Sequence, residues 1–589
     1  MKNWKKGLAL VCAGLMSVSA LAGCKAKGNS VSKDPKTINV EVLKASYGAN
    51  WVYEIAEKFE AAYASENYKV NILKPSSDMR HSVALQQLAR GYEATQVDLY
   101  ITGGVSSSAA GQEGDYYDTA GVLCEEISDM WDMKPIGYDG KEESKTLREK
   151  VTHGTVDLFK DNYGKTYGIP YIASTGGFAV NTMKLAKYGI TTLPTTTNEL
   201  FEMFTKIYVG VDGVIQGSRK TNIYPITYYF DTANAYTIDW WQLAMAQYDE
   251  KMFNEYWGWQ TTDAEGNVTW MEADVSPSVN EAFLKSAEVM AQAFDYNIAS
   301  KGTKSNTLDQ AQAAIMDPNS GAVFMCNGSW YLNDMALSFK NQLKDITFIN
   351  FPVVSALADK LWDADEATLE AMLRYAIAQV DDLSKASDPA AIAADMTTRF
   401  NVAVSEADVV EVRRARYAYS IRTSSEQMVI AKGSPKADIA KLFMRMVASD
   451  DAAKTIAEKA NGNSAYMTST NTYSKHKFVQ DASKIFTNSY ATGYANKAKG
   501  YRLAVGKNGN TFKFNHVPFY IAGLASWESI YTAEGGLSGK PASVYKTLAL
   551  QMYNDEKAFV QAEYTKEGGW KALNSARIEE YRTILGYNK

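Results

Sequence analysis

The chain has 589 residues, with 61 Lys and Arg against 67 Asp and Glu and a formal net charge of −6. A chain of this length is too long for a single hydrophobic core, so it predicts at least two lobes. The acidic balance does not attract phosphate backbones, and this argues against nucleic acid as a partner.

The first residues carry the pattern of an export signal. Three lysines lie among the first six residues, and residues 7–21 form an uncharged apolar run. The run is too short to span a bilayer comfortably and predicts the core of a signal peptide. The sequence has no second apolar stretch of the length that a membrane helix needs, so we expect an exported body outside the membrane.

The end of the apolar run predicts a lipid anchor. Leu-Ala-Gly-Cys at residues 21–24 resembles a bacterial lipobox. The resemblance implies that residues 1–23 are removed and that Cys24 carries acyl chains, which hold a protein stably on a membrane when there are two or more. The alternative is an ordinary export signal with a chance cysteine. Residues 24–36 are polar and without periodicity, and they predict a flexible tether to the outer face of a bacterial cell membrane.

The remaining cysteines and the histidines do not predict a metal or redox site. Cys124 and Cys326 lie far apart without CxxC spacing, and we expect two buried thiols. The four histidines show no metal-ligand spacing. The chain also has no Walker-type or dinucleotide glycine loop, so no metal and no cofactor is predicted.

Hydrophobic periodicity predicts an α/β lobe at the start of the mature chain. Residues 38–42 alternate between apolar and polar side chains, as a strand does, and residues 51–63 show helical spacing. A second strand is predicted at 70–72, a second helix over 78–90 and a nearly continuous apolar strand at 97–101. The order strand, helix, strand, helix, strand is typical of a lobe with parallel strands.

The composition changes between about residues 355 and 422, where Ala, Asp and Glu dominate. Apolar residues recur there at helical spacing. We interpret this segment as a helical insert whose apolar stripe serves packing rather than a partner. The stripe consists of Leu369, Met372, Leu373 and Val380.

The stretch "NAYTIDWWQ", residues 234–242, places three aromatic rings beside one aspartate. Thr237 is a good N-cap, which puts Tyr236 and Trp241 at the two positions of a hydrophobic staple. Trp241 then belongs to a buried stripe, whereas Trp240 points elsewhere. We therefore predict that Trp241 lies in the core and that Trp240 faces a ligand cleft.

Several motifs, in order, resemble the extracellular solute-binding proteins of ABC importers, the group that contains maltose-binding protein. "NYGKTYGIPY", "VNTMKLAKYGI" and "LPTTTNEL" resemble one run of that group. "GAVFMCNGSW" and the segment that starts "MVIAKGSPKADIAKLFMRMV" resemble two later ones. The motifs are spread over most of residues 38–470, while the stretch beyond about 470 matches only loosely.

The resemblance implies a periplasmic-binding-protein-like α/β fold with two lobes, hinge crossings and a ligand clasped between the lobes. Lobe one would comprise residues 37–172 and 428–470. Lobe two would comprise residues 173–355 and 471–589, and the helical insert residues 356–426. The chain would be a monomer that delivers its ligand to ABC permease subunits in the membrane.

The resemblance also places the hinge strands near three segments. These are Ile172–Thr175, Met428–Ile430 and Met467–Ser469. A ligand that contacts both lobes would stabilise the closed form, because only a difference in affinity between the two forms drives closure.

The residue types favour a carbohydrate as the ligand, and we expect an oligosaccharide. Sugars need aromatic plates for their C–H faces and carboxylates or amides for their hydroxyls. The chain supplies 37 tyrosines and 12 tryptophans. The candidate ligand-binding residues are Tyr47, Trp51, Asp78, Arg80, Thr175, Asp231, Tyr236, Trp240, Trp330 and Tyr520.

Each candidate has a structural alternative. Trp330 matches the tryptophan that stacks on sugars in the family, but the ring could also be packed under a helix start. Trp51 begins a predicted core stripe, and Asp78 could be an N-cap. Asp231 could be a solvated loop acid.

Other classes of function stay open. An anchored enzyme acting on glycans would need two carboxylates at a set distance, and no spacing singles out a pair. A glycan-holding surface protein without a transporter is a second alternative. A solute-binding protein for a peptide or another non-sugar ligand is a third.

Overall fold

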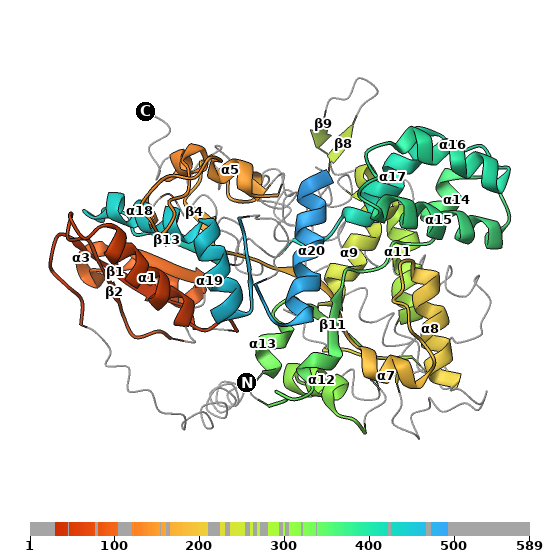
Figure 1. The fold of residues 1–589 in the computed structure, drawn as a ribbon, viewed down its shortest axis with the longest axis horizontal. Coiled ribbons are helices and arrows are strands. Elements are labelled where there is room, and N and C mark those ends of the chain that lie inside the picture. Colours follow the sequence, from red (N-terminus) through yellow and green to blue (C-terminus); the bar gives the residue numbers. More distant parts are fainter. Residues whose placement is uncertain are drawn as a thin grey trace, which may run out of the picture.

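The computed structural model describes most of the chain between Ser30 and Thr492. The described residues are 30–44, 46–76, 81–103, 121, 123–152, 155–160, 165–209, 224–229, 236–253, 260–262, 268–270, 281–293, 298–300, 306–319, 322–336, 338–421, 426–466 and 473–492. They form two α/β lobes and a helical extension of the second lobe (Figure 1).

Lobe one is built on a five-stranded sheet of order β2-β1-β3-β13-β4. Its strands are β1 (Thr37–Val42), β2 (Lys69–Ile72), β3 (Leu99–Gly103), β4 (Gly168–Pro170) and β13 (Glu426–Ile430). The first three pair in parallel, as the alternating pattern predicted, and β13 runs antiparallel to both β3 and β4.

Helices cover this sheet because each presents an apolar stripe to it. In α1 (Asn50–Ala62) the buried residues include Trp51, Ile55 and Phe59, which recur at helical spacing. Phe59 meets Phe443 of α18 edge to face, at 5.5 Å between ring centroids. The other helices of lobe one are α2 (His81–Ala89), α3 (Tyr92–Thr95), η1 (Ser128–Asp132), α5 (Leu147–Lys150), α6 (Thr155–Leu158), α18 (Ala437–Val447) and α19 (Asp450–Ala460).

Lobe two is built on a second five-stranded sheet, in which β11, β6, β10 and β7 lie in that order and β12 also pairs with β6. These strands are β6 (Thr175–Asn181), β7 (Ile226–Thr227), β10 (Phe324–Gly328), β11 (Ile346–Ile349) and β12 (Ser420–Ile421). A separate hairpin joins β8 (Gln260–Thr262) to β9 (Val268–Trp270). The helices are α7 (Thr182–Lys187), α8 (Thr197–Val209), α9 (Thr237–Tyr248), α11 (Glu281–Ala293), α12 (Leu308–Met316), α13 (Tyr331–Met335), η2 (Leu343–Asp345) and α20 (Lys477–Thr492).

The predicted insert is helical and packs on lobe two. It holds α14 (Leu357–Leu361), α15 (Glu366–Asp381), α16 (Pro389–Phe400) and α17 (Glu406–Tyr417). The predicted stripe is buried in the same core as lobe two, which confirms its packing role. Arg414 of α17 is itself buried and donates to the carbonyl oxygens of Ala246 and Gln247, at 2.6 and 2.9 Å. These carbonyls lie in the last turn of α9, where the helix dipole favours a cation.

The chain passes between the lobes at three places. It leaves β4 through β5 (Ile172–Ala173) and enters β6, so the first crossing lies at the predicted Ile172–Thr175. It returns from β12 in lobe two to β13 in lobe one. After β14 (Asn463–Ser464), which pairs with β5, the chain reaches α20, which packs on β11 of lobe two.

The second predicted hinge was misplaced. Residues 428–430 lie inside β13, which pairs with a strand on each side and is therefore part of the lobe-one sheet. The crossing comes before it, between β12 and β13. The third predicted segment, residues 467–469, lies outside the described residues.

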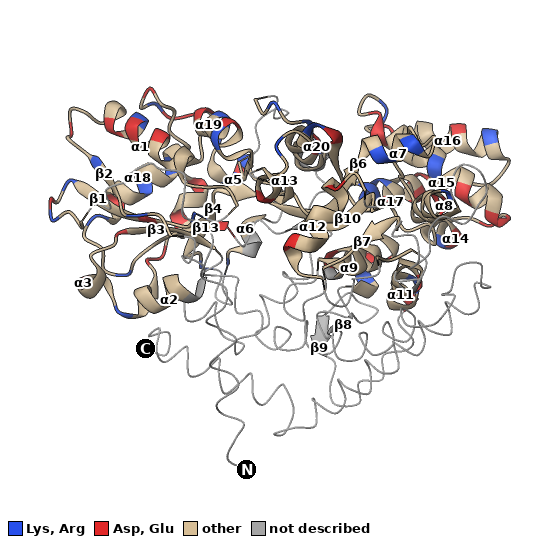
Figure 2. Cartoon of the chain, turned by 90° about the horizontal axis from the view of Figure 1, so that it is seen from below, with Lys and Arg blue, Asp and Glu red and all other residues tan. Residues whose placement is uncertain are grey.

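Charged residues are distributed over the outer helices of both lobes, with acidic and basic side chains interspersed (Figure 2). Within the ranges given above, no helix has the length and the apolar composition that crossing a membrane requires.

Candidate functional site

The ends of several strands meet where the chain passes between the lobes, and we call this region the junction. It is made of Tyr47, Tyr171 and Glu426 from lobe one and of Ser329 and Trp330 from lobe two. Each lies at the same edge of its sheet for a topological reason. Glu426 begins β13 and pairs with Gly103, at the carboxyl end of β3. Because β4 runs antiparallel to β13, Tyr171 follows the end of β4 at this same edge of the sheet.

The centre of the lobe-one side is a hydrogen bond between a tyrosine and a carboxyl group. Tyr171 Oη donates to Glu426 Oε2 at 2.8 Å. Burial raises the pKa of Glu426 to about 7, and the hydrogen bond from Tyr171 opposes this rise. The ring of Trp51 stacks on the ring of Tyr171, with 5.2 Å between centroids and 19° between planes. The lobe-one side of the junction therefore combines two buried, stacked rings with a carboxyl group whose pKa is raised to about 7.

Tyr47 links this carboxyl group to lobe two. Its pKa is raised because the side chain is buried and faces the charge of Glu426, while the neighbouring side chain of Ser329 lowers it. Ser329 is in turn held by the first crossing strand, since its Oγ accepts from the backbone N–H of Thr175 at 3.3 Å. The contact from Tyr47 to Ser329 thus spans the two lobes beside the hinge.

A second set of contacts between the lobes involves α13. Asp334 Oδ1 accepts from Ser46 Oγ of lobe one at 2.7 Å, and Asp334 Oδ2 accepts from Gln312 Nε2 of α12 at 2.8 Å. Burial raises the pKa of Asp334. Asn333 Nδ2 also donates to the carbonyl oxygen of Ala460, at the end of α19, at 2.8 Å. Both lobes are therefore joined by hydrogen bonds between side chains as well as by the chain itself.

Trp330 stands at the boundary between the lobes. It follows β10 in lobe two, yet its half-buried ring packs against the hydrophobic core of lobe one. The ring of Tyr236 lies beside it, at 5.4 Å between centroids. Gly328 leaves room for the ring, because a Cβ atom at this position would come within 2.1 Å of the Trp330 indole. A glycine is therefore needed two residues before the tryptophan.

The structure brings together five of the ten predicted ligand-binding residues. Tyr47 and Trp330 belong to the junction. Trp51 stacks on Tyr171, the backbone of Thr175 binds Ser329, and Tyr236 lies beside Trp330. Thr175 is fully buried, and its Oγ1 donates to the carbonyl oxygen of Gly176 at 2.9 Å. A ligand role for these residues stays a prediction.

The prediction for Trp240 is wrong. Its ring is fully buried in the core of lobe two, stacked at 6.0 Å on Phe351 and edge to face at 4.9 Å with Phe178. The reason is that α9 packs between the sheet on one side and α11 and α17 on another, so more than one of its faces is covered. The prediction for Trp241 is confirmed, since this ring is also fully buried and meets Phe283 at 5.4 Å.

The N-terminus of α9 also differs from the prediction by one residue. Thr237 is the first helical residue rather than the N-cap, and Tyr236 occupies the N-cap position without a side-chain hydrogen bond to the helix.

The remaining predicted site residues lie outside the described part of the chain. They are Asp78, Arg80, Asp231, Tyr520 and the lipid-attachment residue Cys24. Their roles stay predictions.

Four residues of this region were not predicted from the sequence, namely Tyr171, Glu426, Ser329 and Asp334. Tyr171 ends the motif "YGIPY" and directly precedes the predicted first hinge, so its position could have drawn attention to it. Glu426 has no such signal, because it looks like the first residue of an ordinary strand. Asp334 lies on a short helix, where an acid is usually solvated.

The described residues do not assemble a metal site. Among them, no three His, Cys, Asp or Glu side chains are grouped so that they could hold a metal ion. Cys124 and Cys326 are both buried thiols, as predicted, and they are not joined to each other.

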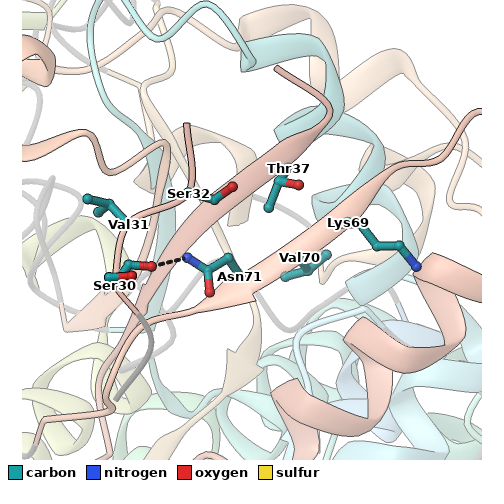
Figure 3. A pocket seen from close by; sticks show the side chains of 7 residues that line it. All are labelled: Ser30, Val31, Ser32, Thr37, Lys69, Val70 and Asn71. Atoms are coloured by element: carbon teal, nitrogen blue, oxygen red, sulfur yellow. Dashed lines mark hydrogen bonds between the residues drawn. The ribbon is translucent and has the colours of Figure 1, made fainter. Parts of the chain in front are cut away.

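A polar surface pocket lies elsewhere, at the edge of the lobe-one sheet (Figure 3). It is lined by residues 30–32, Thr37 and residues 69–71. Strand β2 is the edge strand farthest in the sheet order from β4, which leads into the first crossing. This pocket therefore does not belong to the junction.

Comparison with known proteins gives similarity only at the level of structure. No family model matches the chain, and no curated protein matches it. A probable secreted solute-binding lipoprotein from Streptomyces coelicolor is 12% identical, with a TM-score of 0.48 over 89% of this chain and 100% of that one.

Two further solved structures are similar to the same extent. MalE3 of T. maritima, with maltose bound, is 14% identical, with a TM-score of 0.49 over 89% of this chain and 99% of that chain. The apo form of RafE from Streptococcus pneumoniae is 14% identical, with a TM-score of 0.47 over 91% of this chain and 99% of that chain. Values this low carry no argument about ligand or mechanism, which must come from the residues of this protein.

Proposed function

We propose that this protein is the substrate-binding lipoprotein of an ABC importer, which captures a carbohydrate between its two lobes and delivers it to membrane permease subunits. The observation that carries the proposal is the junction. Two α/β lobes are joined by three passages of the chain, and aromatic rings and carboxyl groups from both lobes meet beside these passages. A ligand that contacts both lobes at such a place stabilises the closed arrangement.

The residue types in and beside the junction suit a sugar. Trp330 and Tyr236 supply aromatic faces for C–H groups, and each oxygen of a carboxylate can accept more than one hydrogen bond from hydroxyl groups. The two carboxyl groups, Glu426 and Asp334, also disfavour an anionic ligand. A peptide binder would need a cation for the terminal carboxylate, and none of the residues that define the junction is a cation.

An anchored glycan-acting enzyme remains the alternative with a specific chemical test. Asp239 in the first turn of α9 and Asp249 at its C-cap lie ten residues apart, which is roughly 15 Å along the helix at about 1.5 Å per residue. Paired glycosidase carboxylates stand only about 5–9.5 Å apart. Asp249 is also engaged by Lys360, at 2.7 Å, and Asp239 is fully buried. This pair does not have the geometry for glycoside hydrolysis.

The lipid anchor is part of the proposal. The lipobox-like residues 21–24 support acylation of Cys24 and attachment to the outer face of the cell membrane. We further propose that the protein acts as a monomer and without a cofactor.

A thermal-shift screen of the full chain against mono- and oligosaccharides, dipeptides and polyols tests the proposal. A ligand that binds only the folded state raises the melting temperature, and we expect the increase with sugars. A shift of the melting temperature with peptides alone would show that the ligand is a peptide rather than a sugar. Turnover of an aryl glycoside would show that the protein is an enzyme rather than a binding protein.

A further inference from the structure

The segment just before β1 is fastened to the edge of lobe one. Residues 30–36 were predicted to belong to the flexible tether, but the structure places them against β1 and β2 (Figure 3). The reason is two asparagine side chains, Asn39 and Asn71, that bind the backbone of this segment. We call Asn39, Asn71 and residues 30–32 the tether dock.

The Asn39 side chain makes two hydrogen bonds to the backbone of the docked segment. Its amide oxygen accepts from the N–H of Ser32 at 2.8 Å, and its amide nitrogen donates to the carbonyl oxygen of the same residue at 2.9 Å. The second hydrogen of this nitrogen goes to the carbonyl oxygen of Gln96 at 2.9 Å. The oxygen also accepts from Asn71 Nδ2 at 2.7 Å. The fully buried amide thus uses its two donors and both lone pairs.

Asn71 and Asp34 hold the two ends of the docked segment. Asn71 Nδ2 donates to the carbonyl oxygen of Ser30 at 2.9 Å, as drawn in Figure 3. Asp34 accepts from the backbone N–H of Lys36 and from Thr37 Oγ1, both at 3.0 Å, and so forms the turn into β1.

A buried ion pair between Asp98 and Lys436 lies next to the tether dock. Asp98 Oδ2 accepts from the backbone N–H of Asn39 at 2.7 Å and lies 2.9 Å from Lys436 Nζ. Lys436 Nζ also donates to the carbonyl oxygen of Thr37 at 2.7 Å. A buried polar network with its members paired holds one geometry, so Asn39 is oriented before the tether binds.

The dock changes how far the body can stand from its anchor. From Cys24 to Ser30 there are six residue steps, which span at most about 20 Å at ~3.3–3.6 Å per residue. If the segment were loose up to Thr37, the same rule would allow roughly 45 Å. Docking therefore shortens the maximum span between Cys24 and the folded body to less than half. The exposed Lys33 and Lys36 add positive charge beside this point, which suits an anionic bilayer surface.

We propose that the tether dock holds lobe one close to the lipid surface and leaves lobe two as the lobe that moves relative to the membrane. The proposal rests on the proposed acylation of Cys24. If lobe one is held in this way, the protein meets the permease with lobe one fixed near the membrane by a short tether. Without the dock, a loose tether of thirteen residues would separate the body from the anchor.

The test combines Asn71→Ala with Ser32→Pro, which remove the donor to Ser30 and the N–H that Asn39 binds. Ser30→Ala is the matched control, because it keeps the carbonyl oxygen that Asn71 uses. The first measurement is hydrogen exchange of the full-length lipoprotein in detergent. We expect the backbone amide of Lys36, which donates to Asp34, to be protected in the wild type and the control and to lose this protection in the double variant, with the melting temperature of the body unchanged.

The second measurement is energy transfer in liposomes of anionic lipid that carry an acceptor. The donor is placed at Tyr53→Cys, an exposed position on α1 of lobe one. We expect the transfer to fall in the double variant and to stay at the wild-type value in the control.

Equal energy transfer in all three proteins, together with lost protection in the double variant, would refute the claim that docking keeps lobe one close to the membrane. Unchanged protection in the double variant would overturn the dock itself. Failure of the wild type to associate with liposomes would instead refute acylation, and the exchange experiment would still decide whether the segment is docked.

Discussion

Replacing Trp240 by alanine should destabilise lobe two and leave the ligand site intact. The indole is fully buried and touches Phe178, Phe351 and Phe201, with centroid distances of 4.9, 6.0 and 6.5 Å. A buried tryptophan removes about 150–250 Å² from water, which corresponds to about 4–6 kcal/mol at ~25 cal/mol per Å². Aromatic-to-alanine changes in cores cost about 3–5 kcal/mol, so we expect a loss of about 4 kcal/mol.

The assay is thermal unfolding of the full chain followed by circular dichroism. A loss of this size should lower the first melting transition by about 8–16 °C, at about 2–4 °C per kcal/mol for a lobe of this size. Trp240→Phe is the matched variant. It keeps a ring in the cavity and removes the indole Nε1, for which no hydrogen-bond partner is found. We therefore expect it to cost less than half as much as alanine.

The result that would refute this reasoning is a Trp240→Ala protein that melts like the wild type and no longer binds sugar. Such a protein would show that the ring faces a ligand and that the burial in the structure does not describe the binding form. Loss of both stability and binding would leave the packing assignment standing, since an unfolded lobe cannot bind.

Three further predictions concern the junction and the anchor. Gly328→Ala should push the Trp330 ring from its place and weaken sugar binding about fivefold, or about 1 kcal/mol, in a calorimetric titration; unchanged affinity would show that the ring is not used. The raised pKa of Glu426, about 7 against an ordinary 4.5, means that the folded state binds more protons, so this group makes stability fall as pH rises from 4.5 to about 7. Glu426→Gln should remove that part of the fall in urea titrations across this range, and an identical pH profile in both proteins would contradict the assignment. Cys24→Ala should abolish labelling of the protein in cells by a fatty-acid probe, whereas equal labelling of variant and wild type would reject the lipid anchor.

The fold of lobe one could be predicted where pairing follows the chain order. Strands β1, β2 and β3 alternate with helices along the chain. The hydrophobic period of each element and the order of the elements are therefore sufficient to predict that these three strands pair in parallel. The position of β13 between β3 and β4 could not be predicted in this way, because it joins residues more than 250 positions apart.

The two tryptophans of α9 show where helical periodicity stops being informative. Adjacent positions on a helix point about 100° apart, so the pattern correctly separates the directions of Trp240 and Trp241. It does not reveal how many faces of the helix are covered. Phe351 and Phe201 come from distant parts of the chain and bury the Trp240 side as well.

Motifs predicted only part of the candidate site, since Trp330 lies in one and was predicted, whereas Tyr171 ends another and was missed. Trp330, Thr175 and Tyr47 lie at strand ends that the resemblance to solute-binding proteins brought together. Glu426 and Asp334 carry no local signal, since only the fold places them beside the crossings. The docking of residues 30–36 was missed for the same reason, because a polar segment gains its partners only from Asn39 and Asn71 in another part of the lobe.

We propose that a carbohydrate binds between the lobes at the junction. Hydrogen exchange of the full chain, with and without the sugar that gives the largest thermal shift, tests this most directly. We expect the sugar to slow exchange in segments of both lobes, around Tyr47 and Glu426 in lobe one and around Trp330 in lobe two. Protection confined to one lobe, or none at the junction while the sugar is bound, would contradict it.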